Sequence, residues 1–299
     1  MPTECKTNWK GIILAGGSGS RLFPLTKSVS KQLLPVYDKP MIYYPLSVLM
    51  LSGIRDIAII TDPSQKDLFV KLLGDGSQWG CSFTYLVQEK PKGIAEAFLI
   101  SKDFLKDSNC CLILGDNLFF GQGLFTLILK AMKRSSGATV FGYHVHDPQR
   151  YGVVEADPEG KVISLEEKPL KPKSNIAVTG LYFYDSSVIS KASNLSPSSR
   201  GELEITDINL EYLYANQLRV EMIPRGVAWL DTGTHESLLE AASFIHAVQE
   251  RQGLLIASPD EIAWRMHYIT SEELFNLGKK YAKNDYGRYL LSLLDNYSY

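Results

Sequence analysis

Cysteine is scarce in this sequence, and neither sign of charge predominates. The four cysteines, Cys5, Cys81, Cys110 and Cys111, form neither a CxxC pair nor a spaced framework. A disulfide scaffold is therefore disfavoured, and a reducing, cytoplasmic setting is expected. Lys and Arg number 31 and Asp and Glu number 33, which gives a formal net charge of −2. A general nucleic-acid binder needs a strongly basic face, so this balance argues against one.

Long apolar runs are absent as well. The first ten residues lack the apolar stretch of a signal peptide, and no later run approaches the roughly 18 residues that cross a membrane. We therefore expect neither a cleaved export signal nor a membrane span. The 45% hydrophobic and 21% charged residues are ordinary for a globular protein. At about 150 residues per domain, the length fits two domains or one α/β domain with a C-terminal extension.

The first two-thirds of the chain alternates short apolar runs with amphipathic stretches, which predicts an α/β fold with a largely parallel, buried sheet. From residue 138 the β-rich runs are denser and separated by turn signals, so we expect antiparallel strands in a mixed central sheet. After Thr234 the pattern is helical. We therefore predict one domain over 1–234 and a helical region over 235–299, suited to packing or subunit contact. Expected strands cover 11–15, 57–61, 83–88, 111–114, 139–145, 152–155, 162–165 and 178–184, and expected helices cover 41–52, 64–73, 94–105, 237–249, 259–267 and 271–282.

The strongest local signal is a glycine-rich turn after the first expected strand, with the sequence GGSGSRLFP from Gly16 to Pro24. Glycines let backbone N–H groups approach an anion, and a helix beginning after the turn adds a favourable dipole, so phosphate binding is expected. The dinucleotide pattern GxGxxG fails at Leu22, and the Walker pattern is missing. Instead, Arg21 and Lys31 supply a bidentate and a movable cation, which together suit a triphosphate.

Three polar residues follow apolar runs. Asp116 and Asp231 follow the runs 111–114 and 227–230, and open α/β sheets bind ligands at the carboxyl ends of their strands. Two converging carboxylates suit Mg²⁺, although either aspartate alone is more often a turn or capping residue. Gln88 also ends an expected strand. Its amide offers a donor and an acceptor, which matches the imide edge of thymine or uracil, and a structural glutamine is the alternative.

Ordered strings along the chain resemble the sugar-nucleotide pyrophosphorylases, the nucleotidyltransferases that join a nucleoside triphosphate to a sugar 1-phosphate. Besides the glycine-rich turn, the strings are SKQLLPVYDKPMIYYP at 30–45, LGDN at 114–117, RYGVV at 150–154, LEEKP at 165–169, GELEITD at 201–207 and WLDTGT at 229–234. The resemblance extends from about Lys10 to the last residues. It implies a Rossmann-like nucleotidyltransferase fold, with a mostly parallel mixed sheet and a helical C-terminal appendage.

The resemblance also implies the site. The catalytic cations would be Arg21, Lys31, Lys168 and Arg200, the last on a mobile loop, and Asp116 and Asp231 would hold one Mg²⁺. The residues implied in nucleotide binding are Leu14, Gly16, Gly17, Ser18, Gly19, Ser20, Arg21, Lys31, Gln32, Gln88 and Gly93. The residues implied in sugar-phosphate binding are Asn117, Tyr151, Gly152, Glu167, Lys168, Val178 and Tyr182.

The implied reaction converts dTTP and glucose 1-phosphate to dTDP-glucose and pyrophosphate, by in-line attack on the α-phosphate, as the first step toward dTDP-L-rhamnose or a related dTDP-sugar. A homotetramer with feedback binding of a downstream dTDP-sugar in the tail is also implied, with no nucleic-acid or membrane partner. A uridylyltransferase or another sugar-1-phosphate nucleotidyltransferase is the alternative, because one methyl contact at the base is worth only about 1–3 kcal/mol. A non-catalytic sensor or a scaffold is disfavoured, because Arg21, Lys31 and both aspartates are present.

Overall fold

In the computed structural model of the chain, which describes residues 8–17 and 19–295, strand β1 (Trp9–Leu14) lies inside a nine-stranded sheet. Its side chains alternate between the two faces. Ile13 packs in one hydrophobic core, whereas Ile12 and Leu14 pack in the core on the opposite face. Because both faces are covered, the apolar residues Ile12, Ile13 and Leu14 follow one another directly and do not alternate with polar ones.

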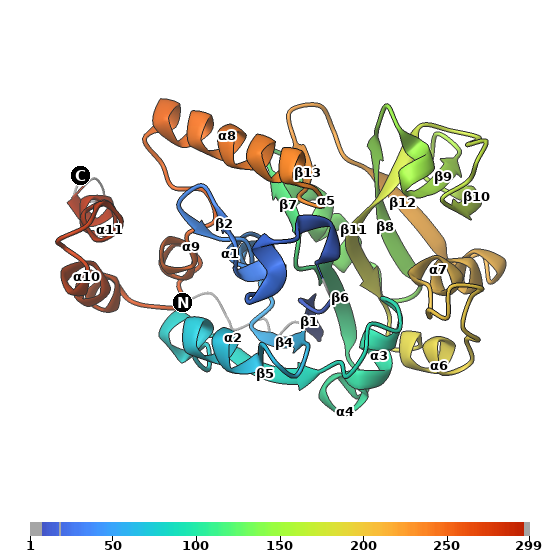
Figure 1. The fold of residues 1–299 in the computed structure, drawn as a ribbon, viewed down its shortest axis with the longest axis horizontal. Coiled ribbons are helices and arrows are strands. Elements are labelled where there is room, and N and C mark those ends of the chain that lie inside the picture. The colour runs from blue at the N-terminus through green and yellow to red at the C-terminus, as the bar shows by residue number, and fades with distance from the viewer. Residues whose placement is uncertain (1–7, 18, 296–299) are drawn as a thin grey trace.

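The sheet has the order β10-β9-β11-β6-β1-β4-β5, and β8 and β12 extend it from β11. The pairings make β10 and β11 run opposite to the other seven strands, so the sheet is mixed and mostly parallel, as predicted (Figure 1). The remaining strands of this sheet are β4 (Asp56–Thr61), β5 (Ser82–Val87), β6 (Asn109–Leu114), β8 (Ala138–His144), β9 (Gly152–Ala156), β10 (Val162–Glu167), β11 (Ile176–Tyr184) and β12 (Leu218–Met222).

Two small antiparallel ribbons lie outside the main sheet. One pairs β2 (Pro35–Val36) with β3 (Lys39–Pro40). The other pairs β7 (Asn117–Phe120) with β13 (Ala228–Asp231). Since β7 begins three residues after β6 ends, this second ribbon continues from the carboxyl edge of the central strands.

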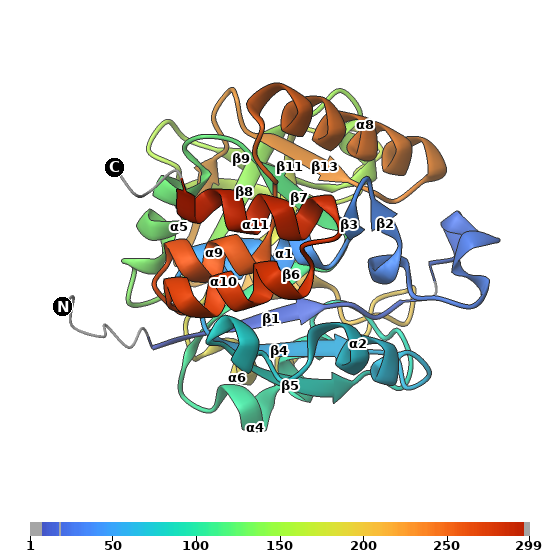
Figure 2. The same ribbon diagram turned by 90° about the vertical axis from the view of Figure 1, so that its left-hand side faces the viewer.

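Helices cover both faces of the sheet. Figure 1 shows α9, α10 and α11 grouped on one side and α6 and α7 on the other, and Figure 2 shows α9 to α11 in front of the sheet. The helices are α1 (Tyr43–Leu51), α2 (Lys66–Leu73), α3 (Glu96–Ile100), α4 (Lys102–Leu105), α5 (Leu124–Met132), α6 (Val188–Ser193), α7 (Ile205–Tyr214), α8 (His235–Gln252), α9 (Pro259–Arg265), α10 (Ser271–Lys280) and α11 (Asp285–Asp295).

The expected helix over 94–105 is divided into α3 and α4 at Ser101. The Ser101 side chain is fully buried, and its hydroxyl donates to the Ala97 carbonyl over 2.6 Å. The backbone angles of Ser101, φ −93° and ψ 10°, depart from regular helical values, and this departure divides the helix at that residue.

The C-terminal helices pack directly on the rest of the chain. Ile262, Leu274 and Leu290 belong to the same hydrophobic core as Ile13 of β1. Helix α8 begins with a capping box in which Thr234 and Ser237 exchange side-chain and backbone hydrogen bonds. Residues 1–234 and 235–299 thus share a core, and the division between them stays a prediction. Within the described ranges, no helix is long and apolar enough to cross a membrane.

Candidate active site

The glycine-rich turn leaves β1 in a conformation that requires glycine. Gly17 and Gly19 have φ angles of 109° and 57°, which residues with a side chain rarely adopt. A Cβ atom on Gly16 would lie 2.9 Å from Gln88 Oε1, so the close approach of this side chain also requires a glycine. Ser18, predicted as a nucleotide ligand, lies outside the described residues.

The segment after this turn differs from the prediction. It contains three short 3-10 helices, η1 (Ser20–Leu22), η2 (Leu25–Lys27) and η3 (Lys31–Leu33), and the next α-helix is α1. The left-handed Gly19 and the restricted backbone before Pro24 interrupt a regular helix here. The expectation of an α-helix dipole aimed at the glycine-rich turn is therefore wrong, and backbone N–H groups and side-chain cations remain as the predicted phosphate-binding groups.

Lys31 and Asp116 form an ion pair beneath the turn. The Lys31 Nζ atom lies 2.6 Å from Asp116 Oδ2, and Lys31 is only 8% exposed. The other carboxylate oxygen of Asp116 accepts a 3.0 Å hydrogen bond from Asn117 Nδ2. Both oxygens of this carboxylate are thus oriented by neighbouring side chains.

The pairing of β13 with β7 brings the second predicted metal ligand to the same place. Asp231 lies opposite Asn117 in the ribbon, and the Thr232 hydroxyl donates to the Asp116 carbonyl over 2.9 Å. Burial raises the pKa of Asp231, the negative charge of Asp116 raises it further, and the nearby Lys31, Arg150 and Arg21 oppose this. Two carboxylates that repel each other at the edge of a cavity are well suited to a divalent cation.

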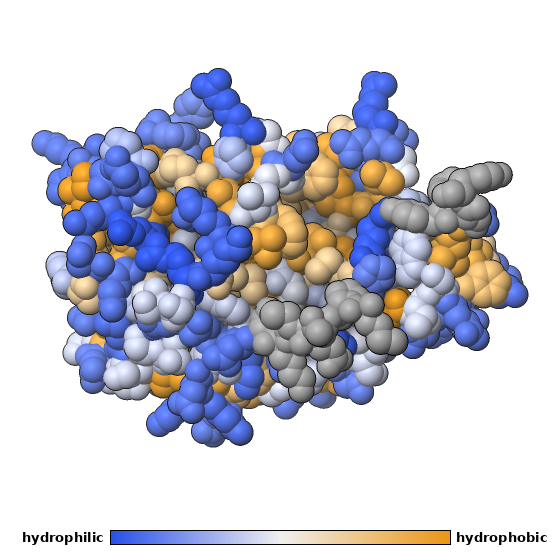
Figure 3. Space-filling view, turned by 180° about the vertical axis from the view of Figure 1, so that it is seen from behind, coloured by the Kyte–Doolittle hydropathy of each residue, from blue (hydrophilic) through white to orange (hydrophobic). Residues whose placement is uncertain are grey.

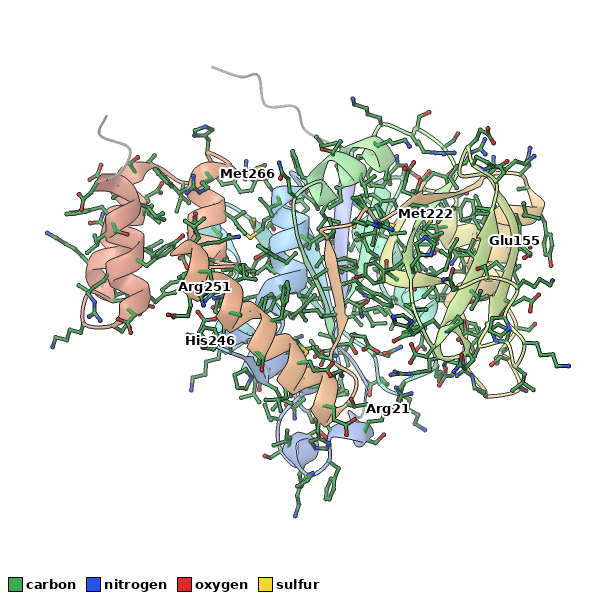
Figure 4. The ribbon with its side chains drawn as sticks, turned by 90° about the horizontal axis from the view of Figure 1, so that it is seen from above. Arg21, Glu155, Met222, His246, Arg251 and Met266 are labelled. Atoms are coloured by element: carbon green, nitrogen blue, oxygen red, sulfur yellow. The ribbon has the colours of Figure 1, made fainter. Side chains whose placement is uncertain are left out.

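A cavity of about 220 Å³ joins these groups to the glycine-rich turn. We call it the phosphate cavity; its lining consists of Gly16, Gly17, Gly19, Ser20, Arg21, Leu22, Lys31, Gln32, Asp116, Asp231 and Gly233. Figure 4 shows Arg21 in the segment that follows the turn, close to the end of α8 at which that helix begins. The predicted cations Arg21 and Lys31 and the predicted metal ligands therefore surround one space.

A second cavity, of about 240 Å³, shares Gly16 and Gly17 with the first. We call it the base cavity; its lining consists of Leu14, Gly16, Gly17, Gln88, Pro91, Gly93, Ile94, Glu167, Lys168, Arg200, Glu202, Glu204 and Ile205. Gly93 has a φ angle of 103°, and a Cβ atom there would lie 2.3 Å from the Leu203 carbonyl oxygen. Only glycine therefore allows the segment before α3 to pack this closely against the segment before α7.

Predicted sugar-side and catalytic residues meet at the rim of the base cavity. Glu167 Oε2 accepts a 2.6 Å hydrogen bond from the Thr206 hydroxyl, and Lys168 Nζ lies 3.5 Å from Glu167 Oε1. Arg200 makes two hydrogen bonds to Glu204, from Nη2 over 2.8 Å and from Nε over 3.1 Å. Its Nη2 atom also lies 3.6 Å from Glu167 Oε1. Glu204 thus holds Arg200 beside Glu167, the residue predicted to bind the sugar.

The amide of Asn117, predicted to bind the sugar, is occupied within the protein. Its Oδ1 atom accepts hydrogen bonds from Trp229 Nε1 over 2.6 Å and from the Gly180 backbone over 3.1 Å. Its Nδ2 atom donates to Asp116. Asn117 is only 4% exposed. Its three hydrogen bonds link β7, β11 and β13 around the carboxylate of Asp116.

The other predicted sugar-binding residues surround the same region. Tyr151 packs against Trp229 with ring centroids 5.3 Å apart, and both line a third cavity that reaches Asp231. Gly152 lies opposite Glu167 in the pairing of β9 with β10. Val178 and Tyr182 flank the irregularity in the pairing of β11 with β8. Tyr182 is buried, which raises the pKa of its hydroxyl, and the carboxylates of Glu167 and Asp116 raise it further.

Five residues that support the site are absent from the prediction: Glu96, Arg150, Glu204, Thr206 and Trp229. Glu204 stands four positions after Arg200 across a turn and not within a helix, so only their closeness in the chain could have indicated this pair. The contacts of the other four depend on how distant segments fold together. No local pattern could have identified them.

Comparison with known proteins shows which proteins this chain is similar to. A family model described as nucleotidyl transferase matches residues 10–248. A glucose-1-phosphate thymidylyltransferase of Xanthomonas campestris is 60% identical over 96% of this chain and 97% of its own length. One of Neisseria meningitidis is 57% identical, over 95% and 99%. The crystal structure of a candidate glucose-1-phosphate thymidylyltransferase of Bacillus anthracis, in complex with sucrose, matches with a TM-score of 0.74 and 45% identity, covering 79% of this chain and 94% of its own.

The family match covers most of the chain, including both cavities, and the relatives match it over nearly their full length. The sequence-based prediction of the fold is thus confirmed by the sheet and by the solved relative. This chain belongs to the nucleotidyl transferase family.

Proposed function

We infer that the protein is a glucose-1-phosphate thymidylyltransferase, which forms dTDP-glucose and pyrophosphate from dTTP and glucose 1-phosphate. The carrying observation is that the phosphate cavity and the base cavity share the Gly16 and Gly17 backbone. One space can therefore hold a triphosphate while the other holds the base and the sugar phosphate. The relatives at 60% and 57% identity bear this name, so a uridylyltransferase is not favoured.

We assign a magnesium ion to Asp116 and Asp231. Among the described residues no group of three or more His, Cys, Asp or Glu gathers as a metal site. Two carboxylates are nonetheless the protein contribution that Mg²⁺ commonly takes, with water and substrate phosphates completing its shell. When bound there, the ion would neutralise charge on the phosphates. Lys31 and Asn117 hold the Asp116 carboxylate in place for this role.

In the proposed reaction, an oxygen of the sugar 1-phosphate forms a bond to the α-phosphorus of dTTP. The bond from that phosphorus to pyrophosphate breaks, and pyrophosphate leaves with the electron pair. The attacking phosphate is already ionised at neutral pH, so no general base is required. Arg21 and Lys31 bind the phosphates of dTTP, and Lys168 and Arg200 bind the sugar phosphate. Catalysis thus consists of positioning two anions and offsetting their repulsion.

The remaining predicted residues complete this proposal. Gly16, Gly17, Gly19, Ser20 and Gln32 line the space for the triphosphate, and Leu14 packs beside the nucleoside. Ser18 stays a predicted nucleotide ligand outside the described residues. Gln88 and the Gly93 backbone read the base edge, and Glu167 accepts hydrogen bonds from sugar hydroxyls. Tyr151, Gly152, Val178 and Tyr182 shape the sugar side, to which Asn117 contributes by holding the strands together.

The test is release of pyrophosphate from dTTP and glucose 1-phosphate in the presence of Mg²⁺. Asp116→Asn and Asp231→Asn should abolish the Mg²⁺-dependent turnover, because each removes a charge from the proposed metal site. Asp107→Asn, at an exposed position after α4, is the matched control and should keep full activity. Circular dichroism checks that all three variants fold. Undiminished turnover in Asp116→Asn or Asp231→Asn would rule the proposal out.

We further propose a homotetramer that binds a downstream dTDP-sugar at a second site in its tail. Apolar side chains are exposed on the back of the molecule (Figure 3), where they could bury against other subunits. A cavity of about 330 Å³ between α1, α5 and α9 supplies a place for the effector. Its lining includes Leu51, Phe120, Phe125, Ile256, Glu261 and Arg265.

Light scattering tests the assembly, which should have the mass of four chains. Feedback binding predicts that dTDP-L-rhamnose inhibits the enzyme without competing with dTTP. Ile256→Trp should fill the effector cavity and relieve inhibition while preserving turnover. Leu129→Trp, on the exposed side of α5 outside this cavity lining, is the control and should remain inhibited. Inhibition that is strictly competitive with dTTP would contradict a second site.

We also propose a cytoplasmic location. The described cysteines, Cys81, Cys110 and Cys111, are all buried and free, which suits a reducing compartment. Cys5 lies outside the described residues. Fractionation of cells that contain the natural protein, followed by immunoblotting, tests this directly: recovery outside the cytoplasmic fraction would refute it.

A further inference from the structure

The amide of Gln88 has a fixed orientation in the base cavity. Gln88 is 5% exposed, and its Nε2 atom donates to Glu96 Oε2 over 2.8 Å and to the Gly93 carbonyl over 3.3 Å. Both donor hydrogens are thus directed away from the glycine-rich turn. The acceptor atom Oε1 faces the opposite way, since it lies 2.9 Å from the position that a Cβ atom on Gly16 would take.

Glu96 enforces this orientation more strongly than a neutral partner could. A carboxylate only accepts hydrogen bonds, so turning the amide over would place Gln88 Oε1 against Glu96 Oε2, acceptor against acceptor. The turned amide would also face the Gly93 carbonyl with its oxygen. A hydrogen bond to an ionised acceptor is roughly twice as strong as a neutral one. Because Glu96 begins α3 and packs beside Gln88, its backbone position is set by that helix.

We propose that Glu96 is a positioning residue for base selection. By holding the Gln88 amide, it directs an acceptor into the base cavity, which favours a pyrimidine that carries a hydrogen on N3. Thymine and uracil carry this hydrogen, whereas N3 of cytosine is itself an acceptor. Glu96 therefore acts against cytosine and leaves thymine and uracil undistinguished. The inference deepens the proposed function and rests on it for the assignment of this cavity to the base.

The test compares kcat/KM for dTTP, UTP and dCTP in the wild type and in Glu96→Leu, which removes the acceptor and excludes a substitute water. The preference for dTTP over dCTP should fall by about tenfold, the size expected of one charge-assisted hydrogen bond. The ratio of dTTP to UTP should not change. Glu96→Gln should keep most of the preference for dTTP, because the amide oxygen of the new side chain can still accept from Gln88 Nε2. The Gly93 carbonyl also still disfavours the turned orientation of the Gln88 amide. Glu89→Leu, at the exposed residue next to Gln88, is the matched control and should behave as wild type.

An unchanged preference in Glu96→Leu would overturn the proposal, and so would an equal loss of kcat/KM for all three nucleotides, because a structural role has no base dependence. Should this variant fail to fold, Glu96→Ala replaces it with the same expectation. Should the wild type release no pyrophosphate, the proposed function fails. The inference is then decided by calorimetry, which measures the Kd of dTTP and of dCTP without sugar phosphate. A wild-type preference for dTTP that is lost in Glu96→Leu supports the inference. A preference that Glu96→Leu keeps, or that the wild type lacks, refutes it.

Discussion

Lys31 Nζ lies 2.6 Å from Asp116 Oδ2, so a cation assigned to phosphate binding is held by a carboxylate assigned to the metal. This contact couples the two halves of the proposed site. It offsets the negative charge that Asp116 and Asp231 bring together, and it keeps Lys31 directed into the phosphate cavity. When a metal or a triphosphate binds, Lys31 and Asp116 would exchange contacts with each other for contacts with the ligand, and no further protein group is needed.

Substitution of Lys31 should therefore affect the chemical step more than substrate binding. Lys31→Met removes the charge and keeps a similar length, and we expect kcat to fall by about 10² to 10³, as for other preorganised electrostatic groups. Steady-state kinetics with dTTP and glucose 1-phosphate provides the measurement. Lys27→Met, at a cation of the adjacent 3-10 segment outside the phosphate cavity, is the control. A variant that raises only KM would contradict a role of Lys31 in the chemical step and leave it a role in binding dTTP alone.

Asn117→Ala distinguishes a positioning role from direct sugar binding. The substitution leaves the Trp229 indole and the Gly180 backbone without their acceptor, and Asp116 Oδ1 loses the hydrogen bond from Asn117. We expect the Mg²⁺ concentration at half-maximal activity to rise about tenfold, because one hydrogen bond that orients Asp116 is lost. The KM for glucose 1-phosphate should change less. A larger rise in the KM for glucose 1-phosphate than in the Mg²⁺ requirement would favour a direct contact of Asn117 with the sugar.

Glu204→Ala should weaken the contribution of Arg200 without removing its charge. The guanidinium would lose its two-point carboxylate partner, and the loop would no longer hold it beside Glu167. We expect KM for glucose 1-phosphate to rise by about tenfold, in line with loss of a charge-assisted contact. Arg200→Ala should have at least this effect, and the double variant should resemble Arg200→Ala alone. Additive losses in the double variant would show that the two residues act independently.

Much of this architecture follows from local patterns, because a buried strand such as β1 has a continuous apolar run whatever surrounds it. The division at Ser101 does not, since it depends on the backbone angles that this residue adopts in its buried surroundings. The sequence patterns do not predict helices α5, α6, α7 and α11 either. The glycine-rich turn could be predicted because its residues are adjacent in the chain. The approach of Asp231 to Asp116 instead depends on the pairing of β13 with β7, which no local pattern encodes.

Asp185 provides a stability prediction that depends on pH. Burial, the largest single influence, raises the pKa of this carboxyl, but hydrogen bonds from Ser187, Gly137 and Tyr212 outweigh it and place the pKa below its ordinary value of 3.8. A lowered pKa means that the ionised form stabilises the fold above the ordinary value. That stability is lost as pH falls through the lowered one.

Asp185→Asn should therefore reduce the free energy of unfolding at neutral pH by about 1–3 kcal/mol, because an amide cannot accept all of these hydrogen bonds. The difference from wild type should shrink in acid, where the wild-type carboxyl also becomes neutral. Thermal or urea unfolding across a pH series measures it. Asp107→Asn, at an exposed position after α4, gives the baseline. A difference that stays constant down to the lowest pH would show that ionisation of Asp185 contributes nothing.

Removal of α9 to α11 tests whether the tail can be separated from the catalytic part. Their side chains Ile262, Leu274 and Leu290 fill the core that also contains Ile13, and Trp79 Nε1 donates to Asp260 over 3.0 Å. A chain that ends at Gly253 should expose this core and lose cooperative unfolding, since each large buried side chain is worth about 2–5 kcal/mol on truncation. Trp79→Phe, which removes only the hydrogen bond and part of the ring, should cost far less. If the shortened chain instead unfolds at the wild-type temperature with sharp cooperativity, residues 254–299 contribute nothing to the stability of the rest of the chain.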